Sequence, residues 1–210
     1  MSKQILVDYI PFEVTYQQIN ESISKNNGRL VVNGVLQRAE AKNQNGRVYP
    51  KETLMREAKK YAEVQIKERR ALGELDHPDS SVVNLNNVSH NVLEMHWKGD
   101  DLVGTVEVLG TPAGNILKEL FKSGIKLGIS SRGLGSVEEI NEGDGHDPVV
   151  KVQPDFELIA FDFVSNPSTH GAFLSPTNEG KLNEGVGTRN GKCCHDCKIE
   201  DIIHDIFRGE

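Results

Sequence analysis

The sequence predicts an α+β fold: a mainly antiparallel β body, surrounded by helices, with a flexible C-terminal tail. Three observations predict it. Short stretches rich in Val and Leu recur between turn residues, two longer stretches have apolar residues at helical spacing, and a polar, glycine-rich run follows Pro167. With 210 residues, 37% of them apolar, the chain can bury one sizeable core.

The first half of the chain predicts a strand, a helix and a hairpin. Residues 29–38 are typical of a strand, and Asn45-Gly46 marks a turn in the loop that follows. Residues 51–70 have one apolar face at a spacing of 3–4 residues, which predicts a helix. Residues 88–97 and 102–109 alternate well enough to form a hairpin across residues 98–101.

The second half predicts a capped helix and further strands. Thr111-Pro112 is a good helix start, the helix has an apolar face, and Gly124 ends it. Residues 125–131 and 149–164 are further strand candidates, separated by an acidic, glycine-rich loop. We expect an N-terminal segment at 1–21, a folded domain at 22–176, and a linker with a tail at 177–210.

Composition excludes several classes of function. The net charge is −7 without a long basic stripe, so nucleic acid is not an expected partner. No apolar run is long enough for a membrane span, and the N-terminus lacks a signal-peptide pattern, so we expect the chain in the cytoplasm or in an assembly made there. Cys193, Cys194 and Cys197 all lie near the C-terminus and make no disulfide framework.

Three polar residues lie where a plain β domain has little use for them. His77 follows the helix in GELDHP, Ser130 ends an apolar strand in GISSRG, and Asp162 interrupts the apolar run LIAFDFV. A serine nucleophile needs a base that is itself oriented by a third group, and these residues could supply all three roles. The same residues could instead be a surface histidine, a polar turn and an aspartate paired with a structural arginine.

Together, GELDHP, GISSRGLGSV and the segments between them resemble the prohead core protein proteases of T-even-like tailed bacteriophages, over about residues 36–176. The resemblance implies a serine endopeptidase with a barrel-like fold related to the herpesvirus maturation proteases. It further implies a place inside the immature head, in the host cytoplasm, with phage scaffold, core and capsid proteins as substrates. No cofactor or metal is implied, and whether the chain forms a homo-oligomer stays open.

The resemblance also assigns roles. It matches His77 to the general base and Ser130 to the nucleophile; Asp162 is our choice for the third member, with His90 and Glu157 as rivals. Main-chain N–H groups in a tight turn at Arg132 and Gly133 would hold the oxyanion, with Ser131 as a supporting neighbour. Arg132 could instead hold an acidic substrate residue or brace the turn.

Proteases of this family cut after glutamate, with Leu or Ile two residues earlier and a small residue following. The chain itself contains three such places, which are Glu184-Gly185, Glu142-Gly143 and Glu21-Ser22. We expect activation by removal of the tail after Glu184, trimming after Glu21, and a self-destructive cut after Glu142. Exposed, flexible segments are where a protease can bind an extended chain.

Two other classes of function stay open. The chain could be a non-catalytic scaffold component that is only a substrate. It could also be a metal-dependent hydrolase that uses Glu74, Asp76, His77 and His90, although these lack the HExxH spacing.

In the tail, the three cysteines with His195 and His204 could hold zinc, but the donors are too crowded for one tetrahedral ion. We expect the tail to be an amphipathic tether to the scaffold.

Overall fold

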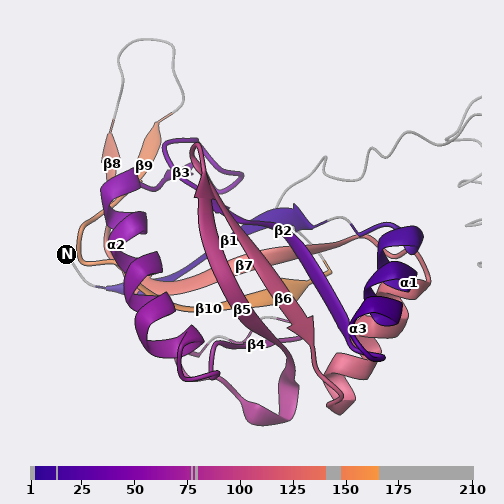
Figure 1. The fold of residues 1–210 in the computed structure, drawn as a ribbon. Helices are drawn as coiled ribbons and strands as arrows, with labels where there is room; N and C mark the ends of the chain where they lie inside the picture. Colours follow the sequence, from indigo (N-terminus) through magenta and orange to yellow (C-terminus); the bar gives the residue numbers. More distant parts are fainter. Residues whose placement is uncertain (1–2, 13, 77, 79, 141–147, 166–210) are drawn as a thin grey trace, which may run out of the picture. The chain divides into compact units, whose positions relative to one another are not determined.

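The computed structural model describes residues 3–12, 14–76, 78, 80–140 and 148–165. These residues confirm the expected mixed fold with mostly antiparallel sheets and few helices (Figure 1). In chain order the elements are β1 (Gln4–Phe12), α1 (Tyr16–Lys25), β2 (Leu30–Arg38), β3 (Arg47–Val48), α2 (Lys51–Tyr61) with a π-helical extension (Ala62–Ile66), β4 (Leu72–Glu74), a 3₁₀ turn (Leu85–Asn87), β5 (Val88–Lys98), β6 (Asp101–Val108), α3 (Pro112–Lys122), β7 (Leu127–Gly135), β8 (Val137–Ile140), β9 (Val149–Val152) and β10 (Glu157–Val164).

Among the described residues, the strands form three sheets. Their orders are β1-β7-β10, β2-β6-β5-β4 and β3-β9-β8, and every pairing except the parallel β3–β9 pair is antiparallel. The first two sheets meet where Leu75, just after β4, forms a parallel bridge with Phe163 of β10. Strand β7, which carries Ser130, is therefore central in its sheet, with β1 on one side and β10 on the other.

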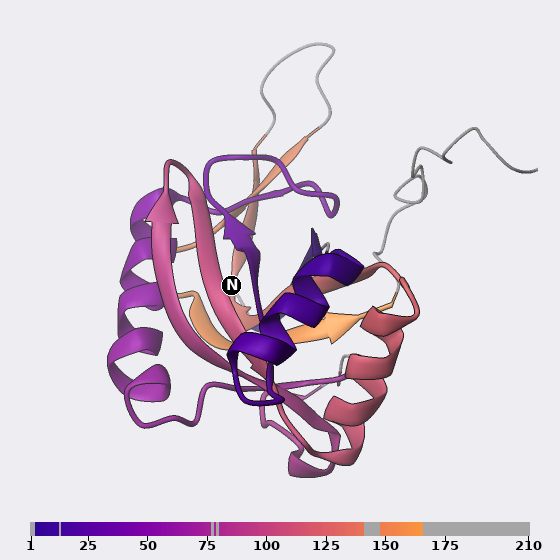
Figure 2. The same cartoon turned by 45° about the vertical axis from the view of Figure 1, so that its right-hand side comes forward.

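The helices lie over two different sides of the strands. Helix α2 lies apart from α1 and α3, which lie together (Figures 1 and 2). A cluster of aromatic rings joins the β1-β7-β10 sheet to α3: the ring of Phe163 on β10 lies 5.2 Å from that of Phe12 on β1 and 5.4 Å from that of Phe121 on α3. All three rings are buried, so this cluster anchors the sheet that carries Ser130 to the rest of the core.

The N-terminal region is more structured than we expected from the sequence. Strand β1 pairs along its whole length with β7, and Pro11 is tolerated because β1 lies at the edge of its sheet. Helix α1 begins with a capping box in which Thr15 and Gln18 bond to each other's main chain. The domain boundary expected at residue 21 therefore falls inside a helix.

Other expected elements need smaller corrections. The stretch 149–164 forms two strands, β9 and β10, on either side of a turn, and β8 lies at the start of the expected acidic loop. Helix α2 continues as a π-helical turn to Ile66 and so ends before residue 70. Thr111 caps α3 and Pro112 is its first residue, as the sequence predicts.

Candidate active site

Ser130 lies in the middle of β7, opposite Tyr9 of β1 and Asp162 of β10. Residues directly opposite each other in an antiparallel pair project from the same face of the sheet, so Ser130 and Asp162 share a face. The Ser130 side chain is completely buried, and its Oγ has no hydrogen-bond partner among the described residues. A buried hydroxyl without a partner is unfavourable and is often found where a protein keeps a group for function.

Asp162 is held by a buried arginine. Its Oδ2 accepts a hydrogen bond of 2.8 Å from Arg132 Nε, and its Oδ1 accepts one of 3.2 Å from Arg132 Nη2 and one of 3.0 Å from the main-chain N–H of Glu74. Both side chains of this ion pair are fully buried. The arginine explains how a carboxylate can lie inside an otherwise apolar strand.

The negative charge of Asp162 influences groups around it. The phenol of Tyr61 has a raised pKa, chiefly because it is buried and then because the Asp162 charge opposes a second negative charge, while Arg132 partly offsets this. The ring of Tyr61 packs edge-on against Phe161, the residue before Asp162. Asp162 therefore acts as a charged centre in a largely dehydrated part of the core.

Arg132 contacts two further groups besides Asp162. Its Nη2 donates to Glu74 Oε1 at 3.0 Å, and its Nη1 donates to the main-chain oxygen of Ser80 at 2.6 Å. The Glu74 side chain is as fully buried as that of Arg132. One guanidinium thus joins β7, β10, β4 and the loop after β4.

The expected tight turn at Arg132 and Gly133 is not present. Strand β7 continues to Gly135, and both residues lie in the ladder between β1 and β10, where Arg132 is opposite Val7 and Gly133 is opposite Leu6. The pairing with β10 shifts register between Leu158 and Ala160, opposite Gly133 and Arg132, so the ladder is irregular at this point. The oxyanion role of these two main-chain N–H groups stays a prediction. The Arg132 side chain already donates to Asp162, Glu74 and the Ser80 oxygen, which does not favour a contact with substrate.

The other expected supporting residues have structural contacts. Ser131 projects from the opposite face to Ser130, because side chains alternate along a strand, and its hydroxyl accepts a 2.7 Å hydrogen bond from Gln37 Nε2. At Gly133 a Cβ atom would lie 2.2 Å from the ring of Phe156. The glycine is required there by close packing.

His77 lies outside the described residues, but the residues on either side of it are described. The main-chain N–H of Asp76 donates to the carbonyl oxygen of Phe163 at 2.8 Å, and the Ser80 oxygen bonds to Arg132. Phe163 adjoins Asp162 on β10 and lies opposite Ile129 of β7. The described residues on both sides of position 77 thus contact the strand pair that carries Ser130 and Asp162.

The two rivals of Asp162 lie in different surroundings. Both ring nitrogens of His90 are engaged, with Nδ1 2.8 Å from Ser89 Oγ and Nε2 2.9 Å from the Phe161 carbonyl oxygen. Burial lowers the pKa of His90 to about 4. Glu157 lies at the surface in a 3.0 Å ion pair with Lys3. Of these three candidates, only Asp162 lies directly opposite Ser130, and the assignment of the third member stays a prediction.

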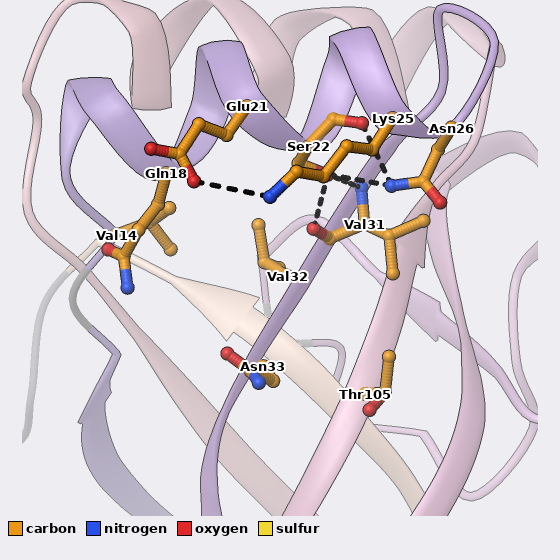
Figure 3. Close-up of a pocket in the computed structure, with 10 residues that line it drawn as sticks. All are labelled: Val14, Gln18, Glu21, Ser22, Lys25, Asn26, Val31, Val32, Asn33 and Thr105. Carbon is orange, nitrogen blue, oxygen red and sulfur yellow. Dashed lines mark hydrogen bonds and ion pairs between the residues drawn. The ribbon is translucent and has the colours of Figure 1, made fainter.

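Of the candidate cleavage sites, only Glu21-Ser22 lies among the described residues. Both residues belong to helix α1, where Ile19 is completely buried and Ser22 Oγ donates to the Val31 carbonyl oxygen at 2.6 Å. The site lines a cavity of about 230 Å³ between α1 and the β2–β6 strands (Figure 3). A protease could bind this site as an extended chain only after α1 unfolds. Glu142-Gly143 and Glu184-Gly185 lie outside the described residues.

Within the described part of the chain, no group of three His, Cys, Asp or Glu side chains is arranged to hold a metal ion. His77 and the cysteines of the tail lie outside that part. Among the described helices, none has the length and apolarity required to span a membrane.

Comparison with known proteins identifies the chain as a member of a protease family. It belongs to the prohead core protein serine protease family, whose family model matches residues 9–184. It is 35% identical over 150 residues to the prohead core protein protease of Enterobacteria phage T4, an alignment that covers 70% of this chain and 68% of the relative. The solved structure of the bacteriophage T4 capsid assembly protease, gp21, is similar with a TM-score of 0.67 and 27% identity, over 79% of this chain and 99% of that chain. The resemblance stated from the sequence is thereby confirmed.

Sequence reasoning overlooked the part that Glu74 and Arg132 play together. The sequence suggests Glu74 only as a metal ligand, and it suggests Arg132 as an oxyanion neighbour, a substrate contact or a brace of the turn, without naming it as the partner of Asp162. The signal available was weak: a charged residue in each of two otherwise apolar strands, Arg132 and Asp162, of opposite sign. Such a pair suggests an ion pair between neighbouring strands.

Proposed function

We propose that this chain is a serine endopeptidase that acts inside the phage prohead, with Ser130 as nucleophile, His77 as general base and Asp162 as the residue that orients the histidine. The observation that carries the proposal is the placement of Ser130 opposite Asp162 on one face of the β7–β10 pair, beside the residues that flank position 77. Family membership supports the peptidase activity.

In this mechanism Ser130 Oγ attacks the scissile carbonyl carbon while His77 takes the hydroxyl proton. The histidine then protonates the leaving amine as the C–N bond breaks, and a water molecule releases the acyl group by the same steps. The negative charge of Asp162, retained in a dehydrated environment by Arg132, would stabilise the imidazolium that forms between the two proton transfers. The unpartnered Ser130 hydroxyl is consistent with a nucleophile that bonds only to its base and substrate.

The proposed substrates are scaffold, core and capsid proteins with Leu or Ile two residues before the cleaved glutamate and a small residue after it. The names of the similar phage proteins, a prohead core protein protease and a capsid assembly protease, support this assignment and the prohead location. The barrel-like closure expected from herpesvirus proteases is supported by the bridge between Leu75 and Phe163, which joins two of the sheets.

The proposed self-processing sites differ in consequence. Cleavage after Glu184 would remove residues 185–210 and leave every described strand intact. Cleavage after Glu142 would separate β7, with Ser130, from β10, with Asp162. Cleavage after Glu21 would detach β1, which pairs with β7 alongside Ser130, so we assign a cut there to inactivation.

The test is to incubate the full-length chain and its Ser130→Ala variant and to follow intact masses over time. We expect the wild type to lose its tail after Glu184. The Ser130→Ala variant should stay intact over the same time, because its cleavage rate should be lower by about 10⁴-fold or more. Ser136→Ala, which alters another buried serine near the end of β7, is the matched control and should process normally. Equal processing of all three proteins would sink the proposal.

The alternative is a non-catalytic core component that is only a substrate. It is distinguished by mixing Ser130→Ala chain, as substrate, with wild-type chain. Cleavage of the variant by the wild type supports the protease. If wild-type chain truncated after Glu184 cuts neither the variant nor a peptide spanning residues 178–188, the scaffold alternative is favoured.

A further inference from the structure

The buried guanidinium of Arg132 is the meeting point of three segments that are distant in sequence. It bonds the Asp162 carboxylate on β10, the Glu74 carboxylate at the end of β4, and the Ser80 main-chain oxygen in the loop after β4. The side chains of Arg132, Glu74 and Asp162 are all completely buried. Each of the three nitrogen atoms of the Arg132 guanidinium therefore already donates to a protein group.

The same cluster fastens both ends of the segment formed by residues 74–84. At its start, the Glu74 N–H donates to Asp162 Oδ1 at 3.0 Å and the Asp76 N–H donates to Phe163 O at 2.8 Å. At its end, the Asn84 N–H donates to Glu74 Oε1 at 3.0 Å, and Ser80 is bonded to Arg132 between the two. His77 belongs to this segment by sequence, so these bonds determine where the chain on both sides of it lies.

Two features of the cluster are unusual for a group that serves stability alone. Two carboxylates share one guanidinium, and Glu74 Oε2 is buried without a hydrogen-bond partner among the described residues. Buried ion pairs are often no more stabilising than apolar residues of similar size, so an imperfectly satisfied cluster is better explained by the geometry it imposes.

We propose that Glu74 and Arg132 are positioning residues for the peptide cleavage described above. Arg132 sets the orientation of Asp162 and, through Ser80 and Glu74, the place of the described residues of the 74–84 segment on the strand pair that carries Ser130. Neither residue touches the substrate or takes part in proton transfer. The inference rests on the proposed function, since it concerns the same site.

The test uses full-length protein and a peptide spanning residues 178–188, with kcat and KM measured separately for wild type, Glu74→Gln and Arg132→Lys. Glu74→Gln keeps the shape and the Oε1 acceptor, and Arg132→Lys keeps the charge but not the forked donors. Because a displacement of about 1 Å of a catalytic group costs about 100-fold in rate, we expect kcat to fall by about that factor, with KM changed less than about threefold.

The matched control is Glu57→Gln. Glu57 is also a buried carboxylate, and its hydrogen bonds are to Arg56 and the Leu158 N–H, with none to the described residues of the 74–84 segment. It should keep the wild-type kcat. A second variant, Arg132→Ala, should regain activity on addition of millimolar guanidinium, which can occupy the space left by the side chain, and the Ser130→Ala protein should not respond. Where Arg132→Ala fails to fold, the nearly isosteric Glu74→Gln carries the test.

The results of these measurements distinguish a failure of the positioning role of Glu74 and Arg132 from a failure of the proposed peptidase function. A wild type that cleaves the peptide, with Glu74→Gln and Arg132→Lys at wild-type kcat or altered only in KM, overturns the positioning role alone. An equal loss in Glu57→Gln also overturns it, because any buried carboxylate would then have the same effect. A wild type that neither cleaves the peptide nor processes itself overturns the proposed function, and the positioning role with it.

Discussion

Acidification should destabilise the fold through His90, a buried histidine of strand β5. Its Nε2 lies 2.9 Å from the Phe161 carbonyl oxygen, which can only accept, so Nε2 carries the proton of the neutral ring and Nδ1 accepts from the Ser89 hydroxyl. Burial lowers the pKa of His90 from 6.5 to about 4, although the charge of Asp162 and the bond to Phe161 act in the opposite direction. A protonated ring would also lose the hydrogen bond that Ser89 donates.

The size of the effect follows from proton linkage. In the unfolded chain the imidazole titrates near its ordinary value of 6.5, and in the folded chain near 4. Because the folded pKa is depressed, the unfolded chain binds the proton first. The contribution of neutral His90 is therefore complete above about pH 6.5 and is lost as the pH falls towards about 4, which amounts to about 3 kcal/mol of unfolding free energy.

The assay is urea unfolding followed by the fluorescence of Trp97, the only tryptophan, between about pH 7.5 and about pH 4. The Ser130→Ala background avoids self-cleavage during the measurement. His90→Gln removes the titration while keeping an amide that can donate to Phe161, so its unfolding free energy should depend less on pH. His96→Gln changes an exposed histidine of the same strand and is the control.

The difference in unfolding free energy between the His90→Gln protein and its parent isolates the effect of this histidine from that of all other titrating groups. This difference should change by about 3 kcal/mol between about pH 7.5 and about pH 4, because the parent loses more stability. If both proteins lose stability in parallel, or if the His96→Gln control behaves like His90→Gln, the assignment of the acid-labile stability to the buried ring is refuted.

The remaining predictions concern packing and capping, and urea unfolding in the same background checks each of them. Gly73→Ala should lower the unfolding free energy by about 2 kcal/mol or more, because a Cβ there would lie 2.0 Å from the Phe161 carbonyl oxygen; Gly110→Ala, with no atom within 4 Å, should be nearly neutral. Phe121→Ala should cost about 4 kcal/mol, since its buried ring packs against Phe163, and a loss below about 1 kcal/mol would contradict that packing. Thr111→Ala should cost about 1 kcal/mol by removing the side-chain bond to the Gly114 N–H; no loss would show that the cap is unimportant.

Elements with a strong local pattern were predictable from the sequence. The β5–β6 hairpin has alternating apolar residues on both sides of a turn, and α3 has a threonine cap, a proline at its first position and a glycine after its end. These signals act between neighbours in the chain. The structure confirms both elements with boundaries that differ by about a residue or two.

Elements that depend on distant partners were harder to predict. Strand β1 contains Asp8 and Pro11, which disfavour a strand when considered locally, yet Asp8 is buried among bonds from Asn45 and Arg47, and β1 pairs with β7. Helix α1 is not among the elements expected from the sequence, although its capping box, Thr15 with Gln18, is visible there. The turn expected at Arg132 forms instead the continuation of β7, because β1 and β10 pair with it on both sides.

By itself, the sequence determined the mixed fold class, the family resemblance, and the choice of His77 and Ser130 as the residues to test. It could not determine which charged groups meet at the site. Ser130, Arg132, Asp162 and Glu74 come together through strand register and through the contact of two sheets, across up to 88 residues of chain. Register depends on long-range hydrogen bonding and core packing, which leave no periodic signal in the local sequence. Only the tertiary structure therefore decided that Ser130 lies opposite Asp162 and that Arg132 binds two carboxylates.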